Sequence, residues 1–208
     1  FKLNYPDTNH RQISCSGEID ITGNSIDELD GNIQFQKITY EQNGKKYPFN
    51  HVGISKKTGV YQEIKLTTDE FEANISGQYV PTEIPVILNE LNGLWINHEK
   101  KKLEQYYQSK DFNLHITLIK PNQIIPLMWD NIKLDKGSFN FSYNLDNHKI
   151  QSNHSYEGLK IGNISSPKIS AKIQNIKDTN ALNYAISTRG VLQNDSNIFD
   201  IFELSGTL

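Results

Sequence analysis

The sequence predicts a mainly β protein, in which an antiparallel meander forms a thin sheet with one wet face and one helical insertion. Apolar and polar residues alternate with a period of two through almost the whole chain, which is typical of half-buried strands. A strand recurs roughly every 10–14 residues, and this spacing favours a meander. Hydrophobic residues make up only 36% of the chain, against about 45–50% in typical globular domains, so we expect no thick core.

Charge and cysteine content exclude several classes of site. The 21 basic and 24 acidic residues are well mixed and give a net charge of −3, so no basic stripe indicates nucleic acid. The single cysteine, Cys15, excludes a disulfide framework and a cysteine metal cage. No apolar run approaches the roughly 18 residues of a membrane-spanning helix, and the start at Phe1 lacks signal-peptide character. We therefore expect a segment of a longer protein, with its targeting signals elsewhere.

The first predicted elements are a strand over residues 11–22, a polar turn at 24–31 and a hairpin over 29–55. The hairpin turns at Asn43-Gly44, a pair that tolerates positive φ at both central positions. A two-residue loop there gives every apolar residue an apolar partner. The predicted pairs are Tyr40 with Tyr47, Ile38 with Phe49, Phe35 with Val52 and Ile33 with Ile54, and Glu41 faces Lys46.

The apolar positions of this hairpin change parity partway along it. Positions 33 and 35 are odd, whereas 38 and 40 are even, and the partner strand switches at the same place. A shift of one residue turns a side chain to the other face. The sequence therefore predicts either a bulge near Gln36-Lys37, as in a strongly bent sheet, or two halves that face opposite sides.

After a second turn at 56–59, alternating strands continue to Tyr79, and the pattern then becomes helical. An apolar stripe recurs at spacings of three and four, with Thr82 as the N-cap and Pro85 in the first turn. A second short helix is expected in HEKKKLEQYYQSK. The stripe is interpreted either as a helix that closes the end of a sheet or as a lid on a hydrophobic groove. Its members are Ile84, Ile87, Leu88, Leu91, Leu94 and Trp95.

Strands resume at Phe112 and continue to the end of the chain. Asp146-Asn147 offers a tight turn that places Ile150 opposite Tyr143. The stretches LKIGNI, KISAKIQNI, LNYAISTRGVL and IFDIFEL show the same alternation. We count eleven to thirteen strands in a single segment, 1–208. It divides into a first set of strands (1–81), a helical insertion (82–108) and a second set of strands (109–208).

No catalytic or metal-binding motif is evident, and no cofactor is expected. The chain lacks a nucleophile elbow, a Walker loop, a zinc-protease motif and a dinucleotide fingerprint. His148 and His154 lie about 20 Å apart on an extended strand, too far to share a metal, and we expect both to face solvent. A hydrolase is disfavoured because no nucleophile–base pair is visible.

Several stretches resemble one protein family. LDGNIQFQKITYEQNGKKYPFNHVGIS is similar to a recurring segment of TamB-like proteins from Bacteroidota, in which a G-x-I/L strand leads to a T-Y strand end, a polar turn and Y-x-F. The pieces EIKLTTDEFEANISGQY, IPVILNELNGLWI, IKLDKGSFNFSYN, HKIQSN and LKIGNI follow the family's later strands and short helix. The likeness spans residues 17–175, although alternation with N-G turns also occurs in many other β proteins.

The resemblance implies a TamB-like protein of the AsmA-like group. Its fold would be an elongated open groove (β-taco-like) with a hydrophobic concave face and a helical insertion near residues 83–108. Its role would be non-enzymatic: lipid transport of phospholipid between inner and outer membranes, or support of outer-membrane assembly. The implied partners are phospholipid acyl chains, a TamA-like outer-membrane barrel protein and neighbouring segments of the same chain. The implied location is the periplasm, with an inner-membrane anchor outside this segment.

The alternation and the resemblance together predict which residues line such a groove. Removing an acyl chain from water is favourable by about 0.8 kcal/mol per methylene, and many equivalent weak contacts let the chain slide. The predicted lining residues are Phe35, Ile38, Tyr40, Phe49, Ile64, Leu66, Phe71, Ile75, Leu114, Ile116, Phe139, Phe141, Tyr143, Ile150, Ile169, Ile173, Tyr184 and Ile186. The alternative is a closed β-sandwich-type extracytoplasmic binding module for a protein or glycan, in which two sheets about 10 Å apart bury these residues.

Overall fold

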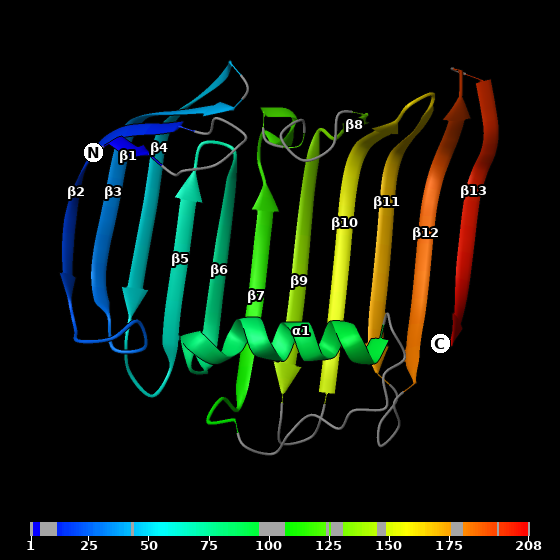
Figure 1. Cartoon of the computed structure of the whole chain (residues 1–208). Coiled ribbons are helices and arrows are strands. Elements are labelled where there is room, and N and C mark those ends of the chain that lie inside the picture. Colours follow the sequence, from blue (N-terminus) through cyan, green and yellow to red (C-terminus); the bar gives the residue numbers. More distant parts are fainter. Residues whose placement is uncertain are drawn as a thin grey trace.

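The computed structural model describes residues 2–4, 12–42, 44–95, 107–123, 125, 131–144, 149–175, 181–194 and 196–207. These residues form one thirteen-stranded antiparallel sheet, crossed by one α-helix (Figure 1). The strands are Lys2–Asn4 (β1), Gln12–Thr22 (β2), Asp30–Gln42 (β3), Lys45–Lys57 (β4), Gln62–Thr68 (β5), Phe71–Gln78 (β6), Asp111–Leu118 (β7), Ile132–Lys133 (β8), Lys136–Asn144 (β9), Lys149–Ile161 (β10), Ile164–Asn175 (β11), Leu182–Gln193 (β12) and Ser196–Thr207 (β13). The helix is Ile84–Trp95 (α1), and short 3-10 turns lie at Pro81–Glu83 (η1) and Pro121–Gln123 (η2).

The strand order in the sheet follows the order in the chain, which confirms the predicted mainly β meander. Each strand pairs with its sequence neighbours, except that β7 pairs with β9 while the short β8 pairs with β10. Because β6 pairs with β7 across the helical insertion, both predicted sets of strands belong to one sheet. Within the described ranges, β1 pairs only with β2 and β13 only with β12, so the sheet is open. No helix in those ranges has the length and apolar character needed to cross a bilayer.

The predicted hairpin register is confirmed pair by pair. Tyr40 lies opposite Tyr47, with ring centroids 6.1 Å apart, and the other predicted partners match as well. Lys46 Nζ lies 3.9 Å from Glu41 Oε2. Gly44 has a φ of 78°, as the turn requires, whereas Asn43 lies outside the described residues. Tyr143 faces Ile150 as expected, but the predicted Asp146-Asn147 turn also lies outside the described part of the chain.

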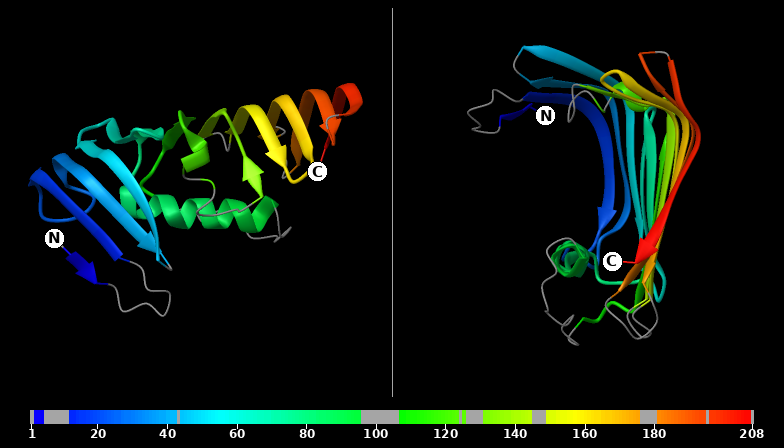
Figure 2. Two further views of the ribbon diagram at one scale, coloured as in Figure 1. Left: turned by 90° about the horizontal axis from the view of Figure 1, so that it is seen from above. Right: turned by 90° about the vertical axis from the view of Figure 1, so that its right-hand side faces the viewer.

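The two faces of the sheet differ in polarity. The inner face carries Ile64, Ile75 and Leu114, which are direct cross-strand partners and pack against the core cluster beneath α1. The outer face carries the alternate residues, and one of its rows is wholly polar from β5 to β11. That row is Lys65, Asn74, His115, Asn140, Asn153 and Lys172. Figure 2 shows the strands curving toward the side on which α1 lies.

A bulge at Lys37 explains the parity change in the first hairpin. Lys37 has a φ of 51°, in the left-handed region. Ile13 and Gly17, four residues apart on β2, face Tyr40 and Phe35, five residues apart on β3. Direct partners share a face, so the extra residue in β3 keeps Phe35 and Tyr40 on the same face. The first predicted alternative, a bulge near Gln36-Lys37, is therefore confirmed.

The same device recurs in two later hairpins. In each of the three hairpins, the two strands keep the same register on both sides of one pair of opposite residues that is left out of the ladder. The first residue of this skipped pair has a positive φ. The skipped pairs are Lys37–Asn50, Gly158–Pro167 and Gly190–Asp200, with φ values of 51°, 65° and 63° for the first residues. A residue at such a position has no ladder hydrogen bond to make, which explains why Pro167 is tolerated inside a strand. These kinks bend the same end of the sheet toward the inner side (Figure 2).

The start of α1 is held by carboxylates from two other parts of the chain. Asp27, in the β2–β3 turn, accepts hydrogen bonds from the Thr82 N–H at 3.0 Å and the Thr82 hydroxyl at 2.9 Å. Glu83 accepts from the Ser109 N–H at 2.9 Å and the Ser109 hydroxyl at 2.6 Å. Thr82 therefore donates its hydroxyl to Asp27 and does not act as the N-cap that we predicted. The expected second helix, HEKKKLEQYYQSK, lies at 98–110; residues 98–106 are outside the described residues, and residues 107–110 are not helical.

Candidate functional site

The inner face carries a continuous row of side chains across the sheet, from β2 to β13. We call it the central row. Each member is the direct cross-strand partner of the next, so the row runs at right angles to the strands. Its members are Ile19, Ile33, Ile54, Leu66, Ala73, Ile116, Phe139, His154, Ala171, Ile186 and Leu204. Only His154 in this row is polar.

None of the central-row side chains is fully buried. Those in the middle of the sheet are half-buried, and exposure rises toward both lateral ends, reaching 56% at Ile19 and 46% at Leu204. By contrast, the second inner-face row toward α1 is closed, with Phe112 at 1% and Tyr143 at 2% exposure. The helix therefore covers one end of the inner face and leaves the central row accessible.

The predicted lining residues lie on one face. Thirteen of the eighteen belong to the central row or to the inner-face rows on either side of it, and Tyr143 and Ile150 lie one row further toward α1. The other three, Ile38, Tyr40 and Phe49, lie beyond the kink, where Ile38 is 8% exposed. Seven of the eighteen form or flank the cluster that the helix covers: Ile64, Ile75, Leu114, Phe139, Phe141, Tyr143 and Ile150.

Several inner-face residues were missing from the predicted set. Ile19 and Leu204 end the central row, and Val52, Leu118 and Phe202 lie in the adjacent row toward the kinks. Their alternation was visible in the sequence. The β2 and β13 residues could have been included had the register of the first hairpin been extended to every neighbouring strand.

The candidate lid is only partly described. Ile84 and Ile87 are 7% and 0% exposed and pack into the cluster with Phe112 and Tyr143. Leu88 is 36% exposed. The backbone at Leu91, Leu94 and Trp95 is helical, but their side chains lie outside the described part of the structure. The described part of the stripe thus acts as a helix that closes one end of the inner face, and its role as a lid stays a prediction.

We predicted that His148 and His154 face solvent; His148 lies outside the described residues, and His154 is not solvent-exposed. It lies on the inner face, half-buried, with its ring edge-on to Phe139 at a centroid distance of 4.7 Å. Its parity matches that of Ile150, so the sequence already contained the signal. The Ser152 hydroxyl lies 2.7 Å from His154 Nε2, and the Tyr156 hydroxyl lies 3.1 Å from His154 Nδ1. Burial lowers the pKa of His154 and raises that of Tyr156.

The Ser152–His154 contact corrects the expectation that no nucleophile–base pair exists, but its surroundings do not suit acyl transfer. Ser152 is 7% exposed and lies in a strand that is paired on both sides, so the neighbouring backbone N–H groups are engaged in the sheet ladder. Free N–H donors are what an oxyanion hole requires. No group of three His, Cys, Asp or Glu residues that could hold a metal occurs in the described ranges.

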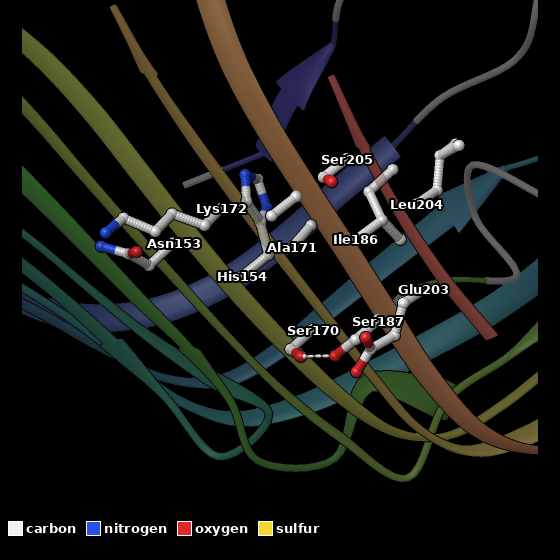
Figure 3. A pocket seen from close by; sticks show the side chains of 11 residues that line it. Asn153, His154, Ser170, Ala171, Lys172, Ile186, Ser187, Glu203, Leu204 and Ser205 are labelled. Carbon is white, nitrogen blue, oxygen red and sulfur yellow. Dashed lines mark hydrogen bonds between the residues drawn. The ribbon is translucent and has the colours of Figure 1, made fainter. Parts of the chain in front are cut away.

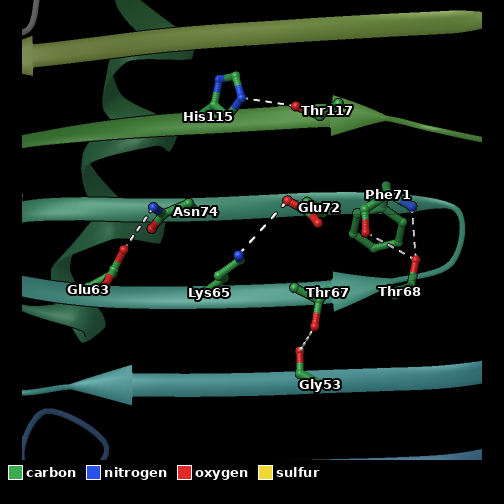
Figure 4. A network of polar contacts seen from close by, with 10 residues as sticks. All are labelled: Gly53, Glu63, Lys65, Thr67, Thr68, Phe71, Glu72, Asn74, His115 and Thr117. Atoms are coloured by element: carbon green, nitrogen blue, oxygen red, sulfur yellow. Dashed lines mark hydrogen bonds and ion pairs between the residues drawn. The ribbon is translucent and has the colours of Figure 1, made fainter.

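The outer face is a network of polar side chains. Asn74 donates to Glu63 at 3.0 Å, and Lys65 Nζ lies 4.0 Å from Glu72 (Figure 4). Such exposed pairs contribute little to stability, but they keep this face hydrated. An open depression of about 510 Å³ over β10 to β13 is lined from both faces: it includes the central-row residues His154, Ala171, Ile186 and Leu204 as well as outer-face residues. Among the latter, the Ser170 and Ser187 hydroxyls lie 2.8 Å apart beside Glu203 (Figure 3).

Lys56 is the one formally charged side chain in the central row and the rows on either side, within the described residues. Its Nζ donates to the carbonyl oxygens of Ile26 at 2.9 Å and Asp27 at 2.7 Å. Burial lowers its pKa. Its charge is thus directed into the β2–β3 turn, and the rest of this surface is neutral.

Comparisons with protein-family models, curated proteins and solved structures found no match to this chain.

Proposed function

We propose that the inner face conducts lipid acyl chains, and that the chain is a groove segment of a TamB/AsmA-like protein of the bacterial cell envelope. In this role it moves phospholipid between inner and outer membranes, or supports outer-membrane assembly, without catalysing a reaction. The observation that carries the proposal is the central row, which is almost wholly apolar and unburied across the described sheet. Large exposed apolar surfaces generally mark a binding site for a protein, membrane or ligand.

The length of the central row supports an acyl ligand. Eleven positions are separated by ten strand spacings, and at about 4.8 Å each they span about 48 Å. The hydrocarbon core of a bilayer is about 30 Å thick, so one leaflet of acyl chains is about 15 Å. The row is therefore about three times as long as one acyl chain, which favours movement along it over storage at one point.

The chemistry of the row supports sliding. Its large side chains are Ile, Leu and Phe, which offer similar dispersion contacts at every step. Similar contacts give similar free energies, so the apolar positions of the row, on either side of His154, hold no deep well for a bound chain.

A single layer of sheet argues against the alternative binding module. A sandwich would place a second sheet about 10 Å from the inner face and bury the central row. All described strands belong to one sheet, and the element packed on its inner face is α1. Periplasmic location, a TamA-like partner and contact with neighbouring segments of the same chain are parts of the same proposal.

Edge strand β13 supports contact with a neighbouring segment. All twelve of its residues are exposed, and they include Ile198, Phe199, Ile201, Phe202 and Leu204. An unpaired apolar edge strand is a template for a further strand. A following strand would extend both the sheet and the inner face.

The proposal is tested by substituting Asp on the inner face and measuring retained phospholipid by native mass spectrometry. Phe141 and Ile150 are poor positions because they lie beneath α1 at 7% and 5% exposure, so a charge there would unfold the cluster. Ile186 is 36% exposed in the central row. We expect the purified wild-type chain to carry phospholipid and Ile186→Asp to retain about tenfold less, because a carboxylate beside an acyl chain is costly to desolvate.

The matched control is Ala185→Asp, which places the same charge on the next residue, exposed on the outer face. Circular dichroism confirms that both variants keep the sheet. Equal lipid retention in the two variants, or a stable wild-type chain that carries no lipid, would count against the proposal.

A further inference from the structure

Three polar side chains interrupt the apolar inner face along β10. Ser152, His154 and Tyr156 alternate on one strand and so project to the same side. Ser152 Oγ is 2.7 Å from His154 Nε2, and Tyr156 Oη is 3.1 Å from His154 Nδ1. They form one hydrogen-bonded string that crosses the central row at right angles.

The string is surrounded by neutral side chains. His154 lies between Phe139 and Ala171, its direct partners on β9 and β11. Tyr156 faces Gly137 and Ile169, and a Cβ on Gly137 would meet the Tyr156 ring at 2.8 Å. Gly137 thus provides the space in which this ring lies. Burial lowers the pKa of His154, which keeps the imidazole neutral at pH 7.

A neutral imidazole gives the string a direction. One ring nitrogen of neutral histidine donates and the other accepts. Ser152 is 7% exposed, and we find no other partner for its hydroxyl in the described residues. A buried hydroxyl without an acceptor is costly, so Ser152 donates to Nε2. The proton then resides on Nδ1 and is donated to Tyr156 Oη.

This arrangement leaves the Tyr156 O–H free to donate toward the inner face. Burial raises the pKa of Tyr156, so its hydroxyl keeps the proton. Tyr156 is half-buried, and unlike Ser152 it is accessible from the inner side. The string therefore presents one directed donor within an apolar surface.

We propose that Tyr156 donates a hydrogen bond to the ester carbonyl of an acyl lipid, with His154 and Ser152 as positioning residues. This inference rests on the proposed lipid-conducting function. A neutral acceptor fits because no described side chain among the inner-face partners of β9 to β12 is charged, and an anionic group would be desolvated there without a counter-ion. The donor would provide a point at which the ester region of the lipid pauses.

The test compares two phosphatidylcholines with the same head group and the same chain length, one with ester linkages and one with ether linkages. The ether lipid lacks the carbonyl oxygen but has the same apolar chains. Binding to the 208-residue chain is measured by titration with native mass spectrometry. We expect the wild type to bind the ester lipid about fivefold more tightly, the value of one net hydrogen bond.

Tyr156→Phe should abolish this preference while still binding both lipids. Ser152→Ala should reduce it, because the imidazole then loses the donor that fixes its tautomer. The matched control is Tyr184→Phe, which removes a hydroxyl from the same face two strands away and should leave the preference unchanged.

The possible failures are distinguishable. Equal wild-type affinity for the two lipids, or an ester preference that survives in Tyr156→Phe, overturns this inference and leaves lipid conduction standing. Binding of neither lipid by a folded wild-type chain overturns the proposed function itself.

Discussion

His154 shows how the position of one residue decides its titration. The ring lies half-buried against Phe139, and burial lowers its pKa below the ordinary value of 6.5. The folded protein therefore binds this proton more weakly than the unfolded chain does. It follows that the stability associated with neutral His154 is fully present above about pH 6.5 and is lost as the pH falls through the lowered pKa of the folded state.

We expect wild-type stability to decrease between pH 7.5 and pH 5 by more than that of His154→Gln, which has no imidazole to titrate at this position. Urea unfolding at both pH values measures the difference. Asn153→Gln, which changes a non-titrating outer-face residue next to His154 on the same strand, is the matched control and should keep the wild-type pH dependence. Equal losses in wild type and His154→Gln would show that His154 is not responsible.

Lys37 is the one kink residue of the three hairpins that has a side chain at its positive φ. The left-handed region costs an L-residue roughly 1–2 kcal/mol, which glycine avoids. Glycine also loses more entropy on folding, by about 0.5–1 kcal/mol. Lys37→Gly is therefore expected to raise the free energy of unfolding by about 0.5–1 kcal/mol.

The measurement is the urea midpoint of Lys37→Gly at unchanged slope. Gly190→Ala is the reciprocal variant, because Gly190 has a φ of 63° and an added Cβ would lie 3.3 Å from the Pro167 ring. It should destabilise the protein. If Lys37→Gly lowers stability, the side chain of Lys37 makes a contribution larger than its backbone strain.

Among the elements, α1 owes its position to contacts distant in the sequence. Asp27 binds Thr82 across 55 residues, and Glu83 binds Ser109 across 26. Ile87 is fully buried and packs in the same cluster as Phe112 and Tyr143 of the inner face. Sequence periodicity predicts the helix but not these anchors, because neither carboxylate occupies a standard capping position.

Asp27→Ala should loosen the start of α1 and cost about 1 kcal/mol, as for the loss of a helix cap. Hydrogen exchange of the 84–95 amides measures the effect, and we expect faster exchange there while β9 to β12 keep their protection. Asp20→Ala, an exposed residue of β2, is the control. Uniform acceleration across the sheet would indicate global destabilisation in place of local release.

Of the three kinks, the alternation of apolar residues predicts only the one at Lys37. The bulge at Lys37 was predictable because both strands of one hairpin change parity opposite each other. At Gly158 and Gly190 the same switch occurs, but it is masked by polar neighbours such as Ser166 and Arg189 on the adjoining positions. Glycine followed by an apolar residue, opposite Pro167 or Asp200, is the signal that could have identified them.

For the whole molecule, alternation predicts which face is apolar but not how much of it is covered. Phe141 and Ile116 carry the same pattern in the sequence, yet Phe141 is 7% exposed beneath the helix and Ile116 remains half-buried. Coverage depends on where α1 docks, a long-range property. The Ser152–His154–Tyr156 string was not predicted, because His154 was expected to face solvent although it has the same parity as Ile150.

Each strand pairs almost only with its neighbours in the chain, so the sheet behaves as a one-dimensional array. In such arrays stability is approximately a sum over adjacent units. Inserting a hairpin would lengthen the inner face by two strand spacings, about 10 Å, and leave the registers on either side unchanged. The number of hairpins thus sets the distance that the surface spans, while the kinks and α1 set its cross-section independently. This separation makes reach a property that evolution can adjust by duplication alone, without redesigning any existing contact.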